Sequence, residues 1–154
     1  MERLGSSQRA LVRKMRLEDL TSVVQIEREA FTSPWQKDTF AGLIDRPTVE
    51  MLVLEDSVEG VVGYAVLWCV LDEGELANLA VRPRFRGRGL GRKLLEEVIA
   101  VARGRGIAKM YLEVRVSNQL AAGLYRSVGF TDVGTRRAYY DQPREDARIM
   151  VAKL

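Results

Sequence analysis

Histidine is absent from this 154-residue chain, and cysteine occurs once, at Cys69. Without histidine, Ser-His-Asp and Cys-His triads and His-ligated zinc or haem sites are excluded. A single cysteine cannot form an internal disulfide or a redox pair, which fits a reducing, cytoplasmic setting. Any group that accepts a proton in catalysis is therefore a carboxylate, a tyrosine, a lysine or Cys69.

Long apolar runs are also missing. No stretch reaches the roughly 18 to 20 residues that cross a bilayer, and residues 1–9 are polar rather than a basic stretch that leads into an apolar one. We expect neither export nor a membrane partner. The sequence predicts a polar leader over residues 1–9, whose order it leaves open, and a single domain over residues 10–154.

The charge balance is mild. Lysine and arginine number 24 against 21 acidic residues, so the formal net charge is +3, which predicts no general attraction to nucleic acid. Apolar residues make up 47% of the chain and charged residues 29%, as in ordinary globular domains.

Hydrophobic periodicity predicts strands that alternate irregularly with helices. Strands are expected over residues 10–15, 51–54, 58–71, 76–81, 109–116, 130–140 and 147–154, and helices over 20–31, 35–44, 90–104 and 118–128. The last helix is expected to bury Leu120, Leu124, Tyr125 and Val128 on one side. The order favours a mixed α/β sheet flanked by helices.

The segment before the strongest predicted helix concentrates basic residues and glycine. It reads RPRFRGRGLGRK from Arg82 to Lys93, with six basic residues and no acid. A glycine-rich loop that runs into a helix N-terminus presents backbone N–H groups and the positive end of the helix dipole to an anion. This predicts a phosphate or pyrophosphate site, although a solvated basic loop remains the alternative. Neither GxxxxGK[ST] nor GxGxxG fits the spacing, which disfavours P-loop and dinucleotide-binding proteins.

These residues resemble the GNAT superfamily of GCN5-related N-acetyltransferases, whose coenzyme A signature Q/R-x-x-G-x-G/A is met by Arg86, Gly89 and Gly91. The flanking segments NLAV, LGRKLLEEVI, LEVRVSN and LYRSVGF are similar to the RimI-type branch, the ribosomal-protein-alanine N-acetyltransferases. Weaker similarities lie in FTSPW, RRAYY and REDA. Gly87 departs from the family, which more often has a long polar or basic residue there.

The resemblance implies the GNAT fold, a mixed and mostly antiparallel sheet of about seven strands with about four helices. It implies acetyl-CoA as acetyl donor without a metal, and a protein N-terminus as acceptor. The implied acetyl-CoA-binding positions are Leu79, Ala80, Val81, Arg86, Gly87, Arg88, Gly89, Leu90, Gly91, Arg92 and Asn118.

Two catalytic positions follow from the same resemblance. Glu113 matches the family's carboxylate that accepts the amine proton, through a water, and Tyr125 matches the donor of a proton to the coenzyme thiolate. Period-two alternation places Glu113 on the strand face opposite Met110 and Leu112, where it could equally be a solvated residue paired with Arg115 or another cation. Tyr125 could equally be a core aromatic.

Acceptor binding is expected at the aromatic positions Phe31 and Trp35 and at Tyr139 and Tyr140, which could also be packing at a sheet edge. A route through an acetylated Cys69 is disfavoured, because no histidine is present to activate the thiol. Two alternatives remain: a GNAT enzyme that acts on a small amine, and a non-catalytic RNA- or ribosome-binding module. The oligomeric state is not predicted.

Overall fold

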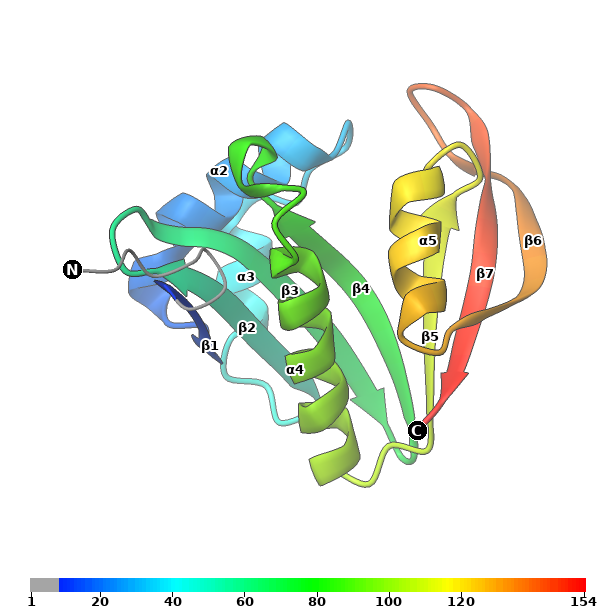
Figure 1. Cartoon of the computed structure of the whole chain (residues 1–154), viewed down its shortest axis with the longest axis horizontal. Helices are drawn as coiled ribbons and strands as arrows, with labels where there is room; N and C mark the ends of the chain where they lie inside the picture. Colours follow the sequence, from blue (N-terminus) through cyan, green and yellow to red (C-terminus); the bar gives the residue numbers. More distant parts are fainter. Residues whose placement is uncertain (1–8) are drawn as a thin grey trace.

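A seven-stranded sheet forms the centre of the protein, in a computed structural model that describes residues 9–154 (Figure 1). The strands are β1 (Ala10–Lys14), β2 (Val49–Asp56), β3 (Gly60–Val70), β4 (Glu73–Val81), β5 (Lys109–Arg115), β6 (Thr131–Tyr140) and β7 (Glu145–Lys153), in the spatial order β1-β2-β3-β4-β5-β7-β6. Neighbours are antiparallel except β4 and β5, which are parallel. The predicted mixed, mostly antiparallel sheet is confirmed.

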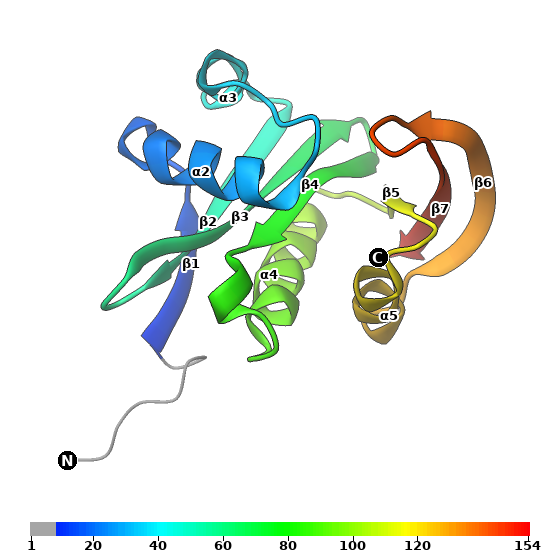
Figure 2. The same ribbon diagram turned by 90° about the horizontal axis from the view of Figure 1, so that it is seen from above.

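Helices cover both faces of the sheet. The described residues form α2 (Leu20–Ala30), α3 (Lys37–Leu43), α4 (Leu90–Gly104) and α5 (Gln119–Ser127), with 3₁₀ turns at Leu17–Asp19 and Pro83–Phe85. Figure 2 shows α2 and α3 on one side of the strands and α4 and α5 on the other. Among these helices, none combines the length and the apolar character that a membrane crossing requires.

The predicted leader falls mostly outside the described residues. Residues 1–8 are not described, whereas Arg9 immediately precedes β1. Its guanidinium pairs with the buried carboxylate of Asp56 at the end of β2, with 3.1 Å between the nitrogen and the oxygen.

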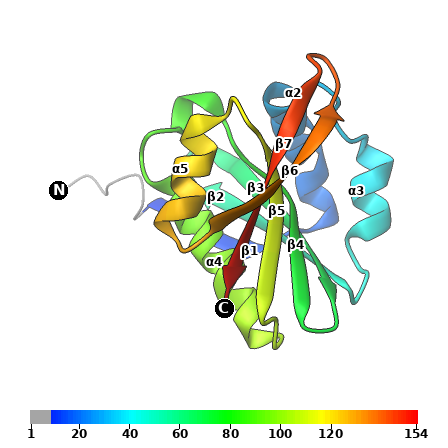
Figure 3. The same ribbon diagram turned by 90° about the vertical axis from the view of Figure 1, so that its right-hand side faces the viewer.

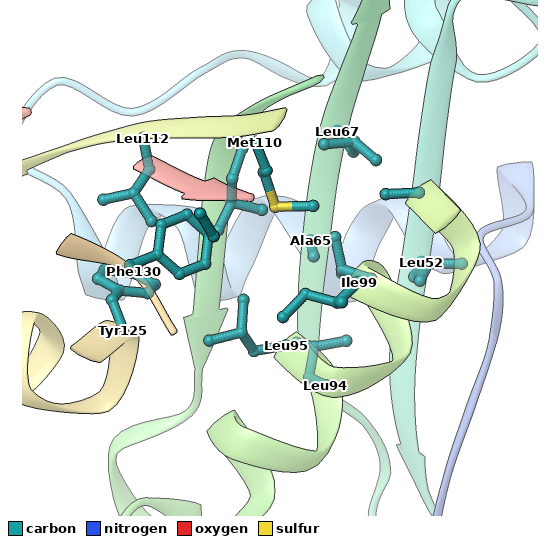
Figure 4. Close-up of a cluster of buried hydrophobic side chains, with 14 of the residues drawn as sticks. Leu52, Ala65, Leu67, Leu94, Leu95, Ile99, Met110, Leu112, Tyr125 and Phe130 are labelled. Carbon is teal, nitrogen blue, oxygen red and sulfur yellow. The ribbon is translucent and has the colours of Figure 1, made fainter. Parts of the chain in front are cut away.

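The α4 side of the sheet carries the larger core. Leucines recur on one face of α4 because Leu90, Leu94, Leu95 and Val98 follow helical spacing, and all are at most 1% exposed. Figure 4 shows Leu94, Leu95 and Ile99 directed at side chains of the sheet, including Met110 and Leu112 of β5. Gly106, whose φ is +80°, follows the helix and allows the chain to turn toward β5.

The opposite face is covered by α2 and α3. Val23 and Ile26 of α2 and Phe40 of α3 are fully buried against β2 and β3. The ring of Phe40 meets that of Tyr64 edge-on, with 5.7 Å between centroids. The sheet is therefore buried on both faces near its middle, which explains the nearly continuous apolar sequence of β3.

A bulge in β4 marks the point at which two parts of the sheet, one from β1 to β4 and the other formed by β5, β6 and β7, begin to diverge. Val66 of β3 pairs with Asn78 while Leu67 pairs with Leu76, so Ala77 is the extra residue on β4. The parallel ladder between β4 and β5 runs only from the Glu73–Lys109 pair to the Leu76–Leu112 pair. Beyond the bulge the two strands diverge, and β5 continues with β7 as its neighbour (Figure 1).

Two expectations for the region after β5 were wrong. Leu120 is 91% exposed, because the buried side of α5 consists of Ala122 and Tyr125. Val116, the last residue of the strand predicted over residues 109–116, is 36% exposed because β5 ends at Arg115.

The two leucines provide a matched test of the core. Leu95→Ala should lower the free energy of unfolding by about 2 to 5 kcal/mol, because it leaves a cavity between α4 and the sheet. Leu120→Ala makes the same change at an exposed position and should shift that free energy by no more than about 0.5 kcal/mol. Urea denaturation measures both, and equal effects would contradict the packing described here.

Candidate active site

A cavity of about 600 Å³ lies where β4 and β5 diverge. Its lining comes from the end of α2, the segment that follows α2, the strands β4 and β5, the start of α5, and the end of β6. Figure 3 views the molecule from the side on which β6, β7 and α5 lie. Because these segments are far apart in sequence, only the tertiary fold assembles this site.

Eight predicted site residues line this cavity together. They are Phe31, Trp35, Leu79, Glu113, Asn118, Tyr125, Tyr139 and Tyr140. The other predicted acetyl-CoA-binding positions are not among its lining residues: Ala80 and Val81 are each 6% exposed in the core, and residues 86–92 follow farther along the chain, up to the first turn of α4.

Glu113 projects from the middle of β5, and its side chain is 18% exposed. Its Oε1 accepts a hydrogen bond from Arg136 of β6 at 2.6 Å. Its Oε2 is buried and has no hydrogen-bond partner within the part of the chain that the structure describes. The predicted ion pair with a cation thus exists, through Arg136 rather than Arg115, and one carboxylate oxygen remains for a further donor.

Tyr125 lies on the buried side of α5 and is 8% exposed. Its ring meets that of Phe130 at 5.8 Å in an edge-on arrangement, so it is a core aromatic as well as part of the cavity lining. Burial raises the pKa of Tyr125 to about 12. The phenol therefore keeps its proton throughout the neutral and moderately alkaline range.

Tyr139 and Tyr140 form an aromatic pair at the end of β6, with ring centroids 5.0 Å apart. The adjacent Glu113 carboxylate and partial burial raise the pKa of Tyr139, and burial is the main cause that raises the pKa of Tyr140. Arg115 stacks on the Tyr140 ring at 4.5 Å and donates to the carbonyl of Asp141 at 2.9 Å. These contacts fix the pair against β5.

A buried carboxylate that the sequence analysis missed also lines the cavity. Glu27 of α2 is 1% exposed, and its carboxylate accepts hydrogen bonds from Tyr64, Asn78 and the backbone N–H of Trp35. A signal was available, because Glu27 stands seven residues after Leu20 and four after Val23, on the apolar stripe of the helix. A charged residue on such a stripe is informative.

The glycine-rich loop before α4 adopts the backbone that the sequence suggested. Gly87 and Gly89 have φ values of +75° and +76°, and Gly89 is the N-cap of α4. The amide of Lys93 donates to the carbonyl of Gly89, so the preceding amides of the first helical turn point out of the helix end. Together with the helix dipole, this arrangement can bind a phosphate group.

The basic side chains of this segment are largely committed to the protein itself. Arg84 pairs with Glu59 and Arg92 with Glu96, and Arg82 pairs with Glu29. Arg86 donates from Nε to the carbonyl of Val81 at 2.9 Å and so ties the loop to the end of β4. These ion pairs take up part of the positive charge of the segment, so its backbone amides are the groups best placed to bind an anion.

The single thiol is remote from this chemistry. Cys69 is buried in β3 and is not among the cavity residues, and burial raises the pKa of its thiol. Across residues 9–154, no group of three or more acidic or Cys side chains has the arrangement of a metal site.

The cavity therefore contains one group that can accept a proton from a nitrogen atom and one group that can donate a proton to a sulfur atom. Glu113 offers an acceptor oxygen, Tyr125 offers a proton held at a high pKa, and both belong to one cavity. The N-terminus of α4 lies outside this lining and can bind an anionic group of a reactant.

Known proteins resemble this chain in sequence and in fold. The model of the acetyltransferase (GNAT) family matches residues 20–130. A putative [ribosomal protein bS18]-alanine N-acetyltransferase of Bacillus subtilis is 41% identical over 143 residues, which cover 92% of this chain and 94% of the relative. The Salmonella typhimurium [ribosomal protein bS18]-alanine N-acetyltransferase is 42% identical over 138 residues, which cover 88% of this chain and 92% of the relative. The crystal structure of the Escherichia coli ribosomal-protein-S18-alanine N-acetyltransferase superposes with a TM-score of 0.86 at 37% identity. The match covers 94% of this chain and 93% of that structure.

The left-handed backbone at Gly89 can be tested by a matched pair of alanine substitutions. An added Cβ meets no atom within 4 Å at Gly89 or at Gly104, the last residue of α4, but only Gly89 has a positive φ. Gly89→Ala should therefore lower the free energy of unfolding by about 1 to 2 kcal/mol. Gly104→Ala should raise it by up to about 1 kcal/mol. Urea denaturation that ranks the two variants in the opposite order would refute the assigned loop conformation.

Proposed function

The chain belongs to the acetyltransferase (GNAT) family, and from this membership we propose that it transfers the acetyl group of acetyl-CoA to the N-terminal α-amino group of a ribosomal protein that begins with alanine. The observation that carries the proposal is the cavity, which combines Glu113, Tyr125 and the aromatic acceptor positions. The names of the relatives suggest bS18 as the acceptor, and a ribosomal acceptor would place the reaction in the cytoplasm.

Acetyl-CoA supplies an acetyl thioester, and the chain has the features needed to hold it. The diverging β4 backbone after the bulge, at Leu79, Ala80 and Val81, has no parallel partner on its β5 side and can accept an extended pantetheine arm. Residues 86–92 offer the amides of the α4 N-terminus to the pyrophosphate. In this assignment Gly87, Arg88, Leu90 and Gly91 act through the backbone. Asn118, which caps α5 through Ala121, contacts the coenzyme near the cavity.

The reaction begins with deprotonation of the acceptor. An α-amino group with a pKa of ~7.7 to 8.0 is mostly protonated at pH 7, so a base raises the fraction of neutral nucleophile. Glu113 takes that proton, through a water, on its Oε2, which has no hydrogen-bond partner among residues 9–154. The Arg136 contact on Oε1 keeps the carboxylate oriented in the cavity.

The amine nitrogen then bonds to the thioester carbon, and the carbon–sulfur bond breaks with its electron pair on sulfur. Tyr125 donates its proton to that sulfur, the new amide nitrogen releases its second proton to water, and a proton from solvent restores the phenol of Tyr125. Full transfer from a phenol of pKa about 12 to a thiolate of ~8.5 is uphill by roughly 5 kcal/mol. That is well below the roughly 13 to 17 kcal/mol barrier of a typical turnover. The acetyl group passes directly to the amine, without an acyl-enzyme at Cys69.

The proposed acceptor class is tested by an acetyl-transfer assay. Peptides that begin with alanine should be acetylated at the α-amino group, and Glu113→Gln should lower kcat/KM by about 10² to 10⁴ because the base is lost. Polyamines that react while such peptides do not would favour a small-amine enzyme. RNA binding that collapses with salt, without acetyl-CoA binding in calorimetry, would favour a nucleic-acid module instead.

Tyr125→Phe separates turnover from binding. The variant keeps the ring against Phe130 but removes the proton donor, so kcat should fall by about 10-fold or more while acetyl-CoA affinity stays near the wild-type value. Because burial holds the pKa of Tyr125 near 12, the donor form persists as the pH rises, and kcat of the wild type should show no decline from this group up to about pH 10. A fall in acetyl-CoA affinity with unchanged kcat would contradict the role.

A further inference from the structure

Glu27 joins three separate elements at the edge of the cavity. Its Oε1 accepts from the backbone N–H of Trp35 at 3.2 Å, and both of its oxygens accept from Nδ2 of Asn78 at 3.1 and 3.0 Å. The hydroxyl of Tyr64 donates to its Oε2. A helix, the segment after that helix, and the strands β3 and β4 are thus tied to one buried carboxylate.

Two of the hydrogen-bond partners of Glu27, Trp35 and Asn78, also line the cavity. Trp35 ends the segment 31–35, here called the acceptor loop, which lines the cavity through Phe31, Thr32, Ser33 and Trp35. Asn78 is the first paired residue after the β4 bulge and also lines the cavity. A link from Trp35 through Glu27 to Asn78 therefore fixes the separation between the acceptor loop and the divergent part of β4.

We propose that Glu27 is a positioning residue for the acceptor, which holds the acceptor loop against β4 and thereby sets the shape of the cavity that receives the amine. The inference rests on the proposed function, because it assumes that the acceptor enters along this loop. It adds a residue that acts through Trp35 and Asn78 and does not itself exchange a proton with the substrate.

The hydrogen-bond inventory distinguishes Glu27 from Glu113. Both carboxylate oxygens of Glu27 accept from protein donors, whereas Oε2 of Glu113 has no donor within the described part of the chain. Because protein donors already occupy both of its oxygens, the Glu27 carboxylate is suited to hold Trp35 and Asn78 in fixed positions.

Three variants isolate the link to the acceptor loop. Glu27→Met conserves the volume but removes every acceptor, which leaves the Trp35 amide and the Asn78 side chain unpaired. Glu27→Gln retains one oxygen for the Trp35 amide, and its NH₂ group can donate to the Tyr64 hydroxyl. Tyr64→Phe is the matched control, because it removes one donor to the same carboxylate and leaves the contacts to Trp35 and Asn78 in place.

The experiment measures KM for a peptide that begins with alanine, kcat, and acetyl-CoA affinity by calorimetry. Glu27→Met should raise the peptide KM about tenfold or more while kcat and acetyl-CoA affinity change by less than about threefold. Glu27→Gln and Tyr64→Phe should stay within about threefold of the wild type in all three quantities. Hydrogen exchange should show faster exchange of the Trp35 amide in Glu27→Met than in Glu27→Gln.

The outcomes separate this proposal from the proposed function. An unchanged peptide KM in Glu27→Met, or parallel losses in KM, kcat and acetyl-CoA affinity, would overturn the positioning role. Equal damage in Glu27→Gln would also overturn it, because the charge itself would then be required. If Glu27→Met does not fold, Glu27→Asp, which withdraws the carboxylate by one methylene, replaces it with the same expected pattern. A wild-type protein that acetylates no peptide would instead refute the proposed function.

Discussion

The short parallel ladder between β4 and β5 is the constraint on which the site depends. It ends at the Leu76–Leu112 pair, next to the bulge at Ala77, because an extra residue bends β4 away from its neighbour. The cavity opens beyond that point, between one strand held by β3 and another held by β7. Two cores on opposite faces of the sheet keep both halves in place, so the gap persists without a strand to fill it.

Two carboxylates border this cavity in different hydrogen-bond surroundings. Glu113 pairs with Arg136 and lies next to the Tyr139 hydroxyl, and its Oε2 has no hydrogen-bond partner among residues 9–154, which suits the proposed proton acceptor. Glu27 is surrounded by donors from the loop and both strands, which suits a structural connection. A glutamate carboxylate thus suits two different roles, proton acceptor or structural connection, and the number of hydrogen-bond donors around it decides between them.

The proposed anion site before α4 depends on backbone geometry more than on net charge. Several arginines of the RPRFRGRGLGRK segment are paired with Glu29, Glu59 and Glu96, so much of their charge is neutralised locally. The left-handed glycines and the exposed amides at the start of α4 remain directed outward. The ion pairs position the loop, and the helix end supplies the donors for a phosphate.

Local pattern was enough to locate the helices and strands, because the spacing of apolar residues follows the period of each element. It also predicted the glycine-rich turn before α4, and the similarity of short motifs predicted the family. The failures at Leu120 and Val116 arose where a short helix and a strand end have too few neighbours to bury every apolar residue. The partner of Glu113, the pairing of the basic loop and the contacts of Glu27 depend on side chains brought together from distant segments. Only the tertiary structure decided these, because no local periodicity encodes which residues meet across a bulged and divergent sheet.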